Sequence, residues 1–224
     1  MEVPNPWLEL PVSGDCYVLN VDRSAINAYN EYQSGATRII TESIPEPFIG
    51  NPNSARILFL NLNPGHTEGD RTDHMNSEFR NAIFSNIRHE SQEFPFYPLN
   101  PRFSLTGAGK WWRKHTRRLQ EATGLDDFTL ANRLIVIEWF PYHSVGSALP
   151  TEQVCESQQY SFQLAKQILR KGLPVVLMRA KKQWAAVDQC LENEPTLRGR
   201  RAWISKGNME GDLFDRVVAA LKEE

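Results

Sequence analysis

Cysteine is scarce in this sequence, and the shortage limits the kinds of site that the chain can build. The 224 residues include three cysteines, at Cys16, Cys155 and Cys190. An odd number of widely spaced cysteines argues against a disulfide framework and favours reduced thiols, as in a cytoplasm. Three thiols also cannot supply a four-cysteine zinc or iron–sulfur site by themselves.

Long hydrophobic runs are missing as well. No apolar run approaches the ~18 residues that a membrane-spanning helix needs, and residues 1–4 lack the basic and then apolar pattern of a secretory signal. We therefore expect a cytoplasmic protein with no membrane partner. The length fits one domain over residues 1–224, expected to be monomeric. Residues 1–55 are expected to be an N-terminal extension packed on the core.

A strong net charge is also absent, because the formal value is −2. Bulk charge thus gives no sign of a nucleic-acid partner, and only the distribution of charge is informative. Basic residues gather in three groups, which are Lys110, Arg113, Lys114, Arg117 and Arg118; Arg179, Lys181 and Lys182; and Arg198, Arg200, Arg201 and Lys206. They could present one basic face to phosphates, or they could be solvated helix faces.

Apolar runs that alternate with amphipathic stretches predict an α/β fold, a three-layer α/β/α sandwich around a mainly parallel four-stranded sheet. The expected strands are 57–60, 134–137, 173–178 and 202–204. The expected helices are 24–32 with Ser24 as its cap, 76–88, 106–122 with Trp111, His115, Leu119 and Ala122 facing inward, 152–171 with Val154 inward, one that carries Trp184, Val187 and Leu191, and one from 212.

The stretch from Arg56 to Gly65 is the most informative one. A short apolar run, 57–60, leads into Asn63-Pro64-Gly65, which is a strong turn signal. Pro64 favours an extended Asn63, and Gly65 has no side chain to keep a ligand from the backbone. The stretch could simply turn the chain. It could also hold an amide at the C-terminal end of a central strand, where ligands bind in such folds.

The second informative stretch is the apolar run 134–137, which ends in Glu138. A carboxylate directly after a buried strand needs partners, so Glu138 is either functional or paired with a nearby Arg or with His143. His143 could contact a substrate or bond to the loop backbone.

Three further segments offer candidate residues. The polar segment 66–74 is expected to be a loop that forms a pocket wall rather than a metal site, and it offers Glu68 and Asp70 as carboxylates. The stiff aromatic loop 94–103 could stack on a base or fill the core. Glycines ahead of Lys110 at a helix start suit a phosphate.

Taken together, the motifs resemble the uracil-DNA glycosylase superfamily over about residues 55–222. The first active-site motif of the branches without an iron–sulfur cluster is Gly-x-Asn-Pro-Gly, and here Asn61 replaces its first glycine. The segment with Gly107, Gly109 and Lys110 is similar to one that follows this motif. Glu138 stands where the family has a base-reading Asn, and residues 205–209 replace a His-Pro-Ser loop without its His or Pro.

The resemblance implies a DNA glycosylase without a cofactor or metal, which hydrolyses the N-glycosidic bond of a flipped base. Asn63 would orient water, and Asp70 is a candidate base. The expected base-binding residues are Pro64, Gly65, Tyr97, Phe103, Glu138 and His143. The expected DNA-binding residues are Lys110, Arg179, Ser205, Lys206, Asn208 and Met209, the last as a wedge.

The identity of the base turns on Glu138. An ionised carboxylate accepts from the amino group of cytosine but opposes the O4 acceptor of uracil. We therefore expect a C5-modified cytosine, as in modified viral DNA, ahead of uracil, and a role in antiviral defence. Two alternatives are a non-catalytic nucleic-acid-binding protein on the same fold and an enzyme that acts on free nucleosides.

Overall fold

The chain folds into a mixed α/β structure. A computed structural model describes residues 3–146, 149–150, 152–199 and 203–223. The strands are β1 (Ile39–Ile40), β2 (Phe48–Gly50), β3 (Ile57–Asn61), β4 (Leu134–Glu138), β5 (His143–Ser144) and β6 (Val175–Leu177). The α-helices are α1 (Arg23–Glu31), α2 (Glu68–Asp73), α3 (Ser77–Ile87), α4 (Gly107–Thr123), α5 (Asp127–Arg133), α6 (Gln158–Leu169), α7 (Lys181–Val187) and α8 (Leu213–Lys222). Short 3₁₀ helices cover Pro6–Glu9, Gly35–Thr37, Tyr97–Leu99, Pro101–Phe103 and Gln189–Asn193.

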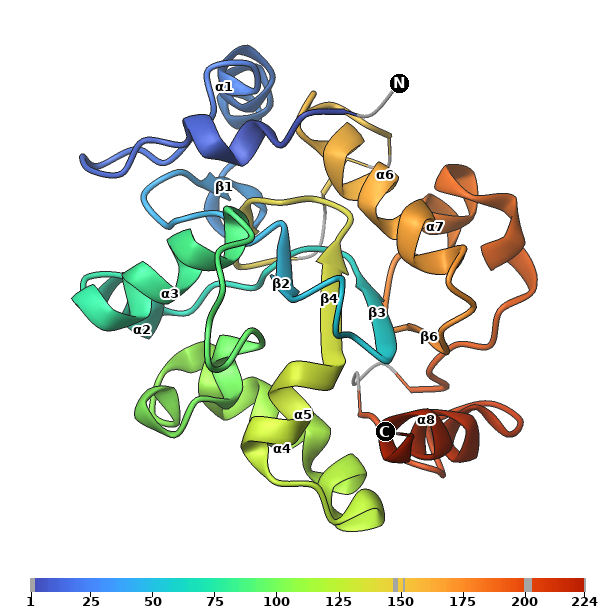
Figure 1. Ribbon diagram of the computed structural model, residues 1–224. Helices are drawn as coiled ribbons and strands as arrows, with labels where there is room; N and C mark the ends of the chain where they lie inside the picture. Colours follow the sequence, from blue (N-terminus) through green and yellow to red (C-terminus); the bar gives the residue numbers. More distant parts are fainter. Residues whose placement is uncertain (1–2, 147–148, 151, 200–202, 224) are drawn as a thin grey trace.

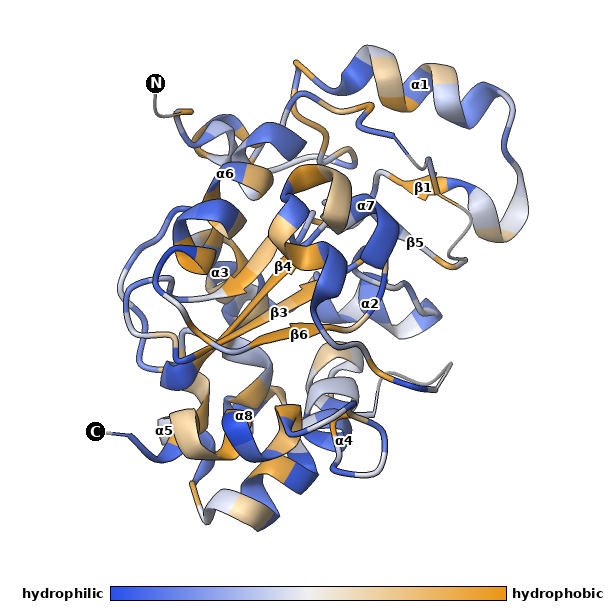
Figure 2. Cartoon of the chain, turned by 90° about the vertical axis from the view of Figure 1, so that its right-hand side faces the viewer, coloured by the Kyte–Doolittle hydropathy of each residue, from blue (hydrophilic) through white to orange (hydrophobic). Residues whose placement is uncertain are grey.

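The central sheet has four strands in the order β2-β4-β3-β6 (Figure 1). The β3 strand is parallel to both β4 and β6, whereas β2 is antiparallel to β4. Figure 2 shows α6 and α7 over one face of the sheet and α4, α5 and α8 under the other. Because both faces are covered, β3 and β4 are buried along their whole lengths, as their continuous apolar runs predict.

The fourth strand differs from the expected one. Trp203 and Ile204 form no strand, and Ala202 lies outside the described residues. The indole of Trp203 instead stacks on His115 of α4, with 5.5 Å between ring centroids. The fourth strand of the sheet is instead β2, at the edge next to β4. It comes from the segment 1–55 that we expected to be an extension. Flanking prolines make that segment resemble a loop in the sequence.

Several helix boundaries also differ from expectation. The cap position of α1 is Asp22 rather than Ser24, and α2 forms inside the segment expected to be a loop. The α6 helix begins at Gln158, because the Gln158 side chain accepts the backbone N–H groups of Val154 and Cys155 ahead of it. Val154 and Ala122 are exposed, and Leu191 lies in the 3₁₀ helix after α7.

Asp22 ties the N-terminal segment to the rest of the fold. This carboxylate is fully buried and accepts hydrogen bonds from the Tyr142 hydroxyl at 2.7 Å and the Ser157 amide at 3.1 Å. A buried charge is tolerated only with such partners.

No helix in the described part of the chain is both long and apolar enough to cross a membrane.

Gly50 provides a test of the β2–β4 pairing. Its φ of +118° is in the region that favours glycine, and a Cβ there would overlap the Leu134 carbonyl oxygen on β4. We expect Gly50→Ala to lower the free energy of unfolding by about 2 kcal/mol, measured by urea denaturation. The matched control is Gly207→Ala, because a Cβ at Gly207 meets nothing within 4 Å. Equal stability of the two variants would contradict the role given to this pairing.

Candidate functional site

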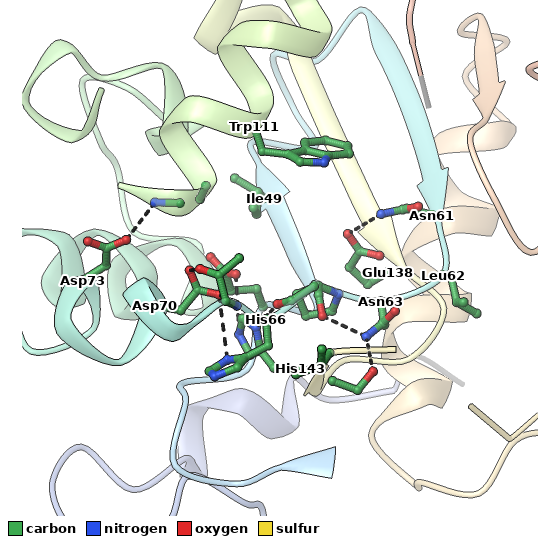
Figure 3. Close-up of a pocket in the computed structure, with 18 of the residues that line it drawn as sticks. Ile49, Asn61, Leu62, Asn63, His66, Asp70, Asp73, Trp111, Glu138 and His143 are labelled. Carbon is green, nitrogen blue, oxygen red and sulfur yellow. Dashed lines mark hydrogen bonds and ion pairs between the residues drawn. The ribbon is translucent and has the colours of Figure 1, made fainter. Parts of the chain in front are cut away.

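A cavity of about 440 Å³ opens where β3 and β4 end. Its walls come from the turn after β3, from α2, from the start of α4, from β4 and β5, and from Arg179 after β6. Figure 3 shows the indole of Trp111 projecting from α4 above the polar side chains of the strand ends. The cavity contains Asn63, Pro64, Gly65, Asp70, Glu138, His143 and Arg179 of the residues expected from the sequence.

Asn61 and Glu138 form a buried pair at the strand ends. The parallel register places their Cα atoms opposite each other, and the Asn61 Nδ2 donates to Glu138 Oε1 at 3.1 Å. Asn61 is 8% exposed and Glu138 is 4% exposed. Among the described residues, Asn61 Oδ1 and Glu138 Oε2 have no hydrogen-bond partner. Unpartnered buried oxygens are rare and costly, so this pair calls for a ligand or for a proton on the carboxyl.

Burial governs the protonation of Glu138. Desolvation raises the pKa of its carboxyl to about 8, and the charge of Glu46 adds to the rise. The bond from Asn61 and the charge of Arg179 act in the opposite direction. The hydrogen bond to Glu138 thus comes from an amide, and the nearby Arg that the sequence suggested as a partner acts on it through the charge of Arg179. At neutral pH most of the carboxyl is the uncharged acid.

Trp184 fixes the end of β3. Its ring is fully buried, and its Nε1 donates to the Asn61 carbonyl oxygen at 2.7 Å. The Trp139 amide donates to the same oxygen at 3.1 Å. Two donors on one carbonyl hold the Asn61 backbone in place, so the side chain that meets Glu138 starts from a rigid position.

The turn after β3 presents the Asn63 amide. Asn63 Nδ2 donates to the Pro64 carbonyl at 2.8 Å and to Ser144 Oγ at 3.0 Å. Both amide hydrogens are thus used inside the protein, and the side-chain oxygen is the atom available to a ligand or water. A Cβ built at Gly65 meets nothing within 4 Å, so this residue leaves open space on the cavity wall.

His143 holds the same turn through the backbone of Gly65. Its Nδ1 lies 2.7 Å from the Gly65 carbonyl oxygen, and its Nε2 lies 2.9 Å from that of Ile44. The two ring nitrogens thus both face backbone carbonyl oxygens. Glu46 Oε2 lies 3.5 Å from the same Nε2, and burial raises the pKa of the Glu46 carboxyl, with the charge of His143 opposing the rise. His143 lines the cavity, but its ring nitrogens bond to the loop backbone, which is one of the two roles that the sequence suggested.

Two neighbouring histidines are neutral. Burial and the charge of His143 hold the pKa of His66 below its usual value and that of His74 well below it. His74 Nδ1 accepts the Ile44 amide at 3.0 Å. Glu46, His74 and His143 lie close enough to suggest a metal site. However, the nitrogens of His143 and Nδ1 of His74 are already used in hydrogen bonds, so these bonds account for the cluster.

The aromatic wall of the cavity is Trp111 rather than the 94–103 loop. Tyr97 is 1% exposed, and its hydroxyl donates to Glu46. Phe103 packs edge-on against Phe79 at 5.1 Å between centroids. Both expected stacking residues therefore fill the core. Trp111, expected in the core, is half-buried and stacks on His115 at 3.7 Å.

Asp70 and Asp73 have structural partners. Asp70 accepts from the Thr67 amide at 2.7 Å and the Thr67 hydroxyl at 2.9 Å, and so caps α2. Asp73 accepts from the Gly107 amide at 2.7 Å, so a carboxylate of the chain occupies the helix start that we expected to bind phosphate. A Cβ at Gly107 would overlap Asp70 Oδ1, which gives this glycine a steric role.

The expected DNA-binding residues are dispersed. Lys110 is exposed at the start of α4, and Arg179 is exposed at the cavity. Lys206 pairs with Asp215 at 2.9 Å, and the Ser205 carbonyl accepts the Met209 amide.

Residues 208 and 209 also serve the fold. Asn208 Nδ2 donates to the Trp203 carbonyl at 2.7 Å. Met209 is 1% exposed, so the expectation of a DNA wedge is wrong for this conformation, because its side chain is part of the core.

Comparison with known proteins adds no family to this geometry. No family model, curated protein or solved structure matches the chain. The site must therefore be interpreted from its own residues. The sequence-based reasoning missed Asn61 as a partner of Glu138, Glu46 as a partner of His143, and Trp111 as a wall. Only Asn61 left a signal, a polar residue at the end of an apolar run.

The raised pKa of Glu138 predicts that the free energy of unfolding depends on pH. The pKa of the Glu138 carboxyl is about 8 in the folded protein and 4.5 in the unfolded chain. The folded state therefore holds this proton more tightly, which stabilises the fold fully at a pH below 4.5. The stabilisation is lost as the pH rises through 8. Glu138→Gln removes the titration. We expect its stability relative to wild type to grow by on the order of 3 kcal/mol between pH 5.5 and 8.5.

Urea denaturation at the two pH values measures this difference. Glu152→Gln is the control, because Glu152 is exposed, and it should behave as wild type at both. A Glu138→Gln variant with the same relative stability at pH 5.5 and 8.5 would show that Glu138 titrates normally.

Proposed function

We propose that this protein is a DNA glycosylase that hydrolyses the N-glycosidic bond of a flipped pyrimidine and leaves an abasic site. One observation carries the proposal. Asn63, Trp111 and the buried pair of Asn61 and Glu138 line one cavity at the strand ends, and within the described part of the chain Asn61 Oδ1 and Glu138 Oε2 have no hydrogen-bond partner. Its volume lies within the roughly 300–1,000 Å³ of small-molecule sites. The likeness of residues 61–65 to the first motif of uracil-DNA glycosylases supports the same proposal.

The residues divide the work as follows. Trp111 offers an indole face for stacking on the base, and Asn61 and Glu138 offer polar atoms to its edge. Asn63 offers its side-chain oxygen to an attacking water, because its nitrogen is held by Pro64 and Ser144. The target base must leave the helical stack, because the bond is out of reach inside a duplex. The transition state resembles an oxocarbenium ion by analogy with glycoside hydrolysis.

The general base is the less defined part of the proposal. Both oxygens of Asp70 are bonded to Thr67, which weakens its claim. His66 lines the cavity as a neutral ring, with its Nδ1 3.8 Å from Asp70 Oδ2. A neutral imidazole beside a carboxylate is a common arrangement for a proton acceptor, so His66 becomes the preferred candidate.

The engaged Asp70 also favours a second candidate function, a non-catalytic nucleic-acid-binding protein that captures an extruded base in the same cavity. Incubation with duplexes that contain uracil or C5-substituted cytosines, followed by abasic-site cleavage on a gel, separates the two. Abasic sites support the glycosylase. Binding without abasic sites favours the second function.

Asn63 gives the sharpest test of catalysis. We expect Asn63→Ala to slow single-turnover excision by about two to four orders of magnitude, the usual loss when a group acts in the transition state. The variant should still fold cooperatively, with a melting temperature a few degrees below wild type, because two side-chain hydrogen bonds are lost. Asn81→Ala is the control, because Asn81 is exposed on α3 outside the cavity. Normal excision by a folded Asn63→Ala protein would remove this residue from the mechanism.

Lys110 tests the DNA-binding face. It is exposed in the first turn of α4, beside the cavity residues Ala108 and Trp111. Loss of one phosphate contact should lower the slope of log K against log salt by about one. We expect this change for Lys110→Ala in fluorescence-anisotropy titrations. Lys222→Ala, at the far end of α8, should leave the slope unchanged. If both variants keep the wild-type slope, DNA does not cross the start of α4.

A further inference from the structure

Two buried oxygens of neighbouring side chains that line the cavity have no partner among the described residues. Asn61 Oδ1 and Glu138 Oε2 belong to side chains that already share one hydrogen bond. Both side chains are more than nine-tenths buried and line the cavity. Such a pair is satisfied in one step by a planar ligand that offers hydrogen-bonding atoms side by side.

We propose that Asn61 and Glu138 act as one recognition unit that binds a pyrimidine edge with Glu138 as the uncharged acid. Glu138 Oε2–H donates to an acceptor of the base, and Asn61 Oδ1 accepts from the neighbouring N–H. The inference rests on the proposed function only for the identity of the heterocycle, because the donor and acceptor pair follows from the contacts.

The uncharged acid fits better than the carboxylate. An ionised Glu138 beside Asn61 Oδ1 would present acceptors alone. The edge of each base at N3 instead pairs one acceptor with one donor, which are N3 and the amino group in cytosine and O4 and N3–H in uracil. With a proton on Oε2, the unit matches N3 and the amino group of cytosine. It also matches O4 and N3–H of uracil. The preference for cytosine that the sequence suggested assumed an ionised Glu138, so the unit now admits both bases.

The surroundings of Glu138 support the acid form. Burial has the largest effect, and Glu46, ahead of β2, opposes ionisation, whereas Arg179, after β6, favours it. Glu46 Oε2 lies 3.5 Å from His143 Nε2, and burial raises the pKa of Glu46 as well. The other titratable side chains of the cavity come from the segment around α2, and they are His66, Asp70, Asp73 and His74. Asp70 and Asp73 accept backbone amides, and the pKa values of His66 and His74 are lowered.

The test measures the binding of free bases by ligand-observed NMR, without DNA and without turnover. The uracil and cytosine probes carry a methyl group on N1, the position that bears the sugar in DNA, because a free N1–H beside O2 would offer a second donor and acceptor pair. Both probes should bind at pH 6.5 and bind about tenfold more weakly at pH 9.0, because the pKa of Glu138 is about 8. The analogues 1,3-dimethyluracil and 1,N4,N4-trimethylcytosine lack every N–H donor and should not bind. The inference is overturned if each probe binds with the same affinity at pH 6.5 and pH 9.0, or if either of these two analogues binds.

Variants assign the effect to Glu138. Glu138→Gln keeps a donor next to Asn61 and should bind cytosine equally at pH 6.5 and 9.0. Asp73→Asn changes another cavity carboxylate and should keep the tenfold difference. If Glu138→Gln keeps the difference, the inference is wrong. The wild-type titration decides the matter even if a variant fails to fold.

The outcome is separable from that of the proposed function. Base binding with the expected pH dependence, in a protein that makes no abasic sites, keeps the recognition unit and removes the glycosylase. Excision of bases whose binding does not depend on pH keeps the glycosylase and removes the role of the acid form.

Discussion

The parallel pairing of β3 with β4 is the constraint on which the site depends. Its register places Asn61 opposite Glu138, and because side chains of paired residues point to the same face, amide and carboxyl meet. A shift of one residue would turn Asn61 to the other face. The pairing continues past the strands, where the Phe140 amide donates to the Leu62 carbonyl at 2.8 Å. The turn that carries Asn63 therefore leaves a fixed platform.

Two clusters of buried polar side chains lie next to these strand ends, and they differ in how fully their hydrogen bonds are satisfied. Glu46, Tyr97 and His143 satisfy one another and the backbone, so this group supports the turn below the cavity. Asn61 and Glu138 satisfy each other only in part. A folded protein tolerates such a deficit where a ligand or a proton removes it, and this makes the incomplete pair the better indicator of a binding site.

The fourth helix shows why local patterns could not settle the roles of single residues. Helical spacing correctly predicts that His115 and Leu119 face the core, and both are buried. The same spacing places Trp111 there, yet it borders the cavity and Trp112 takes the buried position. Periodicity gives the direction in which a side chain points, but not whether the neighbouring element fills the space or leaves it open.

The sequence by itself determined the elements with continuous apolar runs or clear helical periodicity. The strands β3, β4 and β6, the helices α3, α4 and α8, and the turn with Asn63 at a strand end all follow from local residue patterns. It also pointed to Glu138, because a carboxylate after a buried strand is unusual. Local physics suffices for these features, since burial and backbone restriction act within a few residues.

Only the tertiary structure decided the partners. It placed β2 at the sheet edge, gave Asp70 to Thr67, and buried Tyr97, Phe103 and Met209. These outcomes depend on contacts between segments far apart in the chain, such as the 77 residues that separate Asn61 from Glu138. Whether a carboxyl is charged or neutral depends on how completely such contacts exclude water. The chemistry of Glu138 was therefore set by packing, although its position was visible in the sequence.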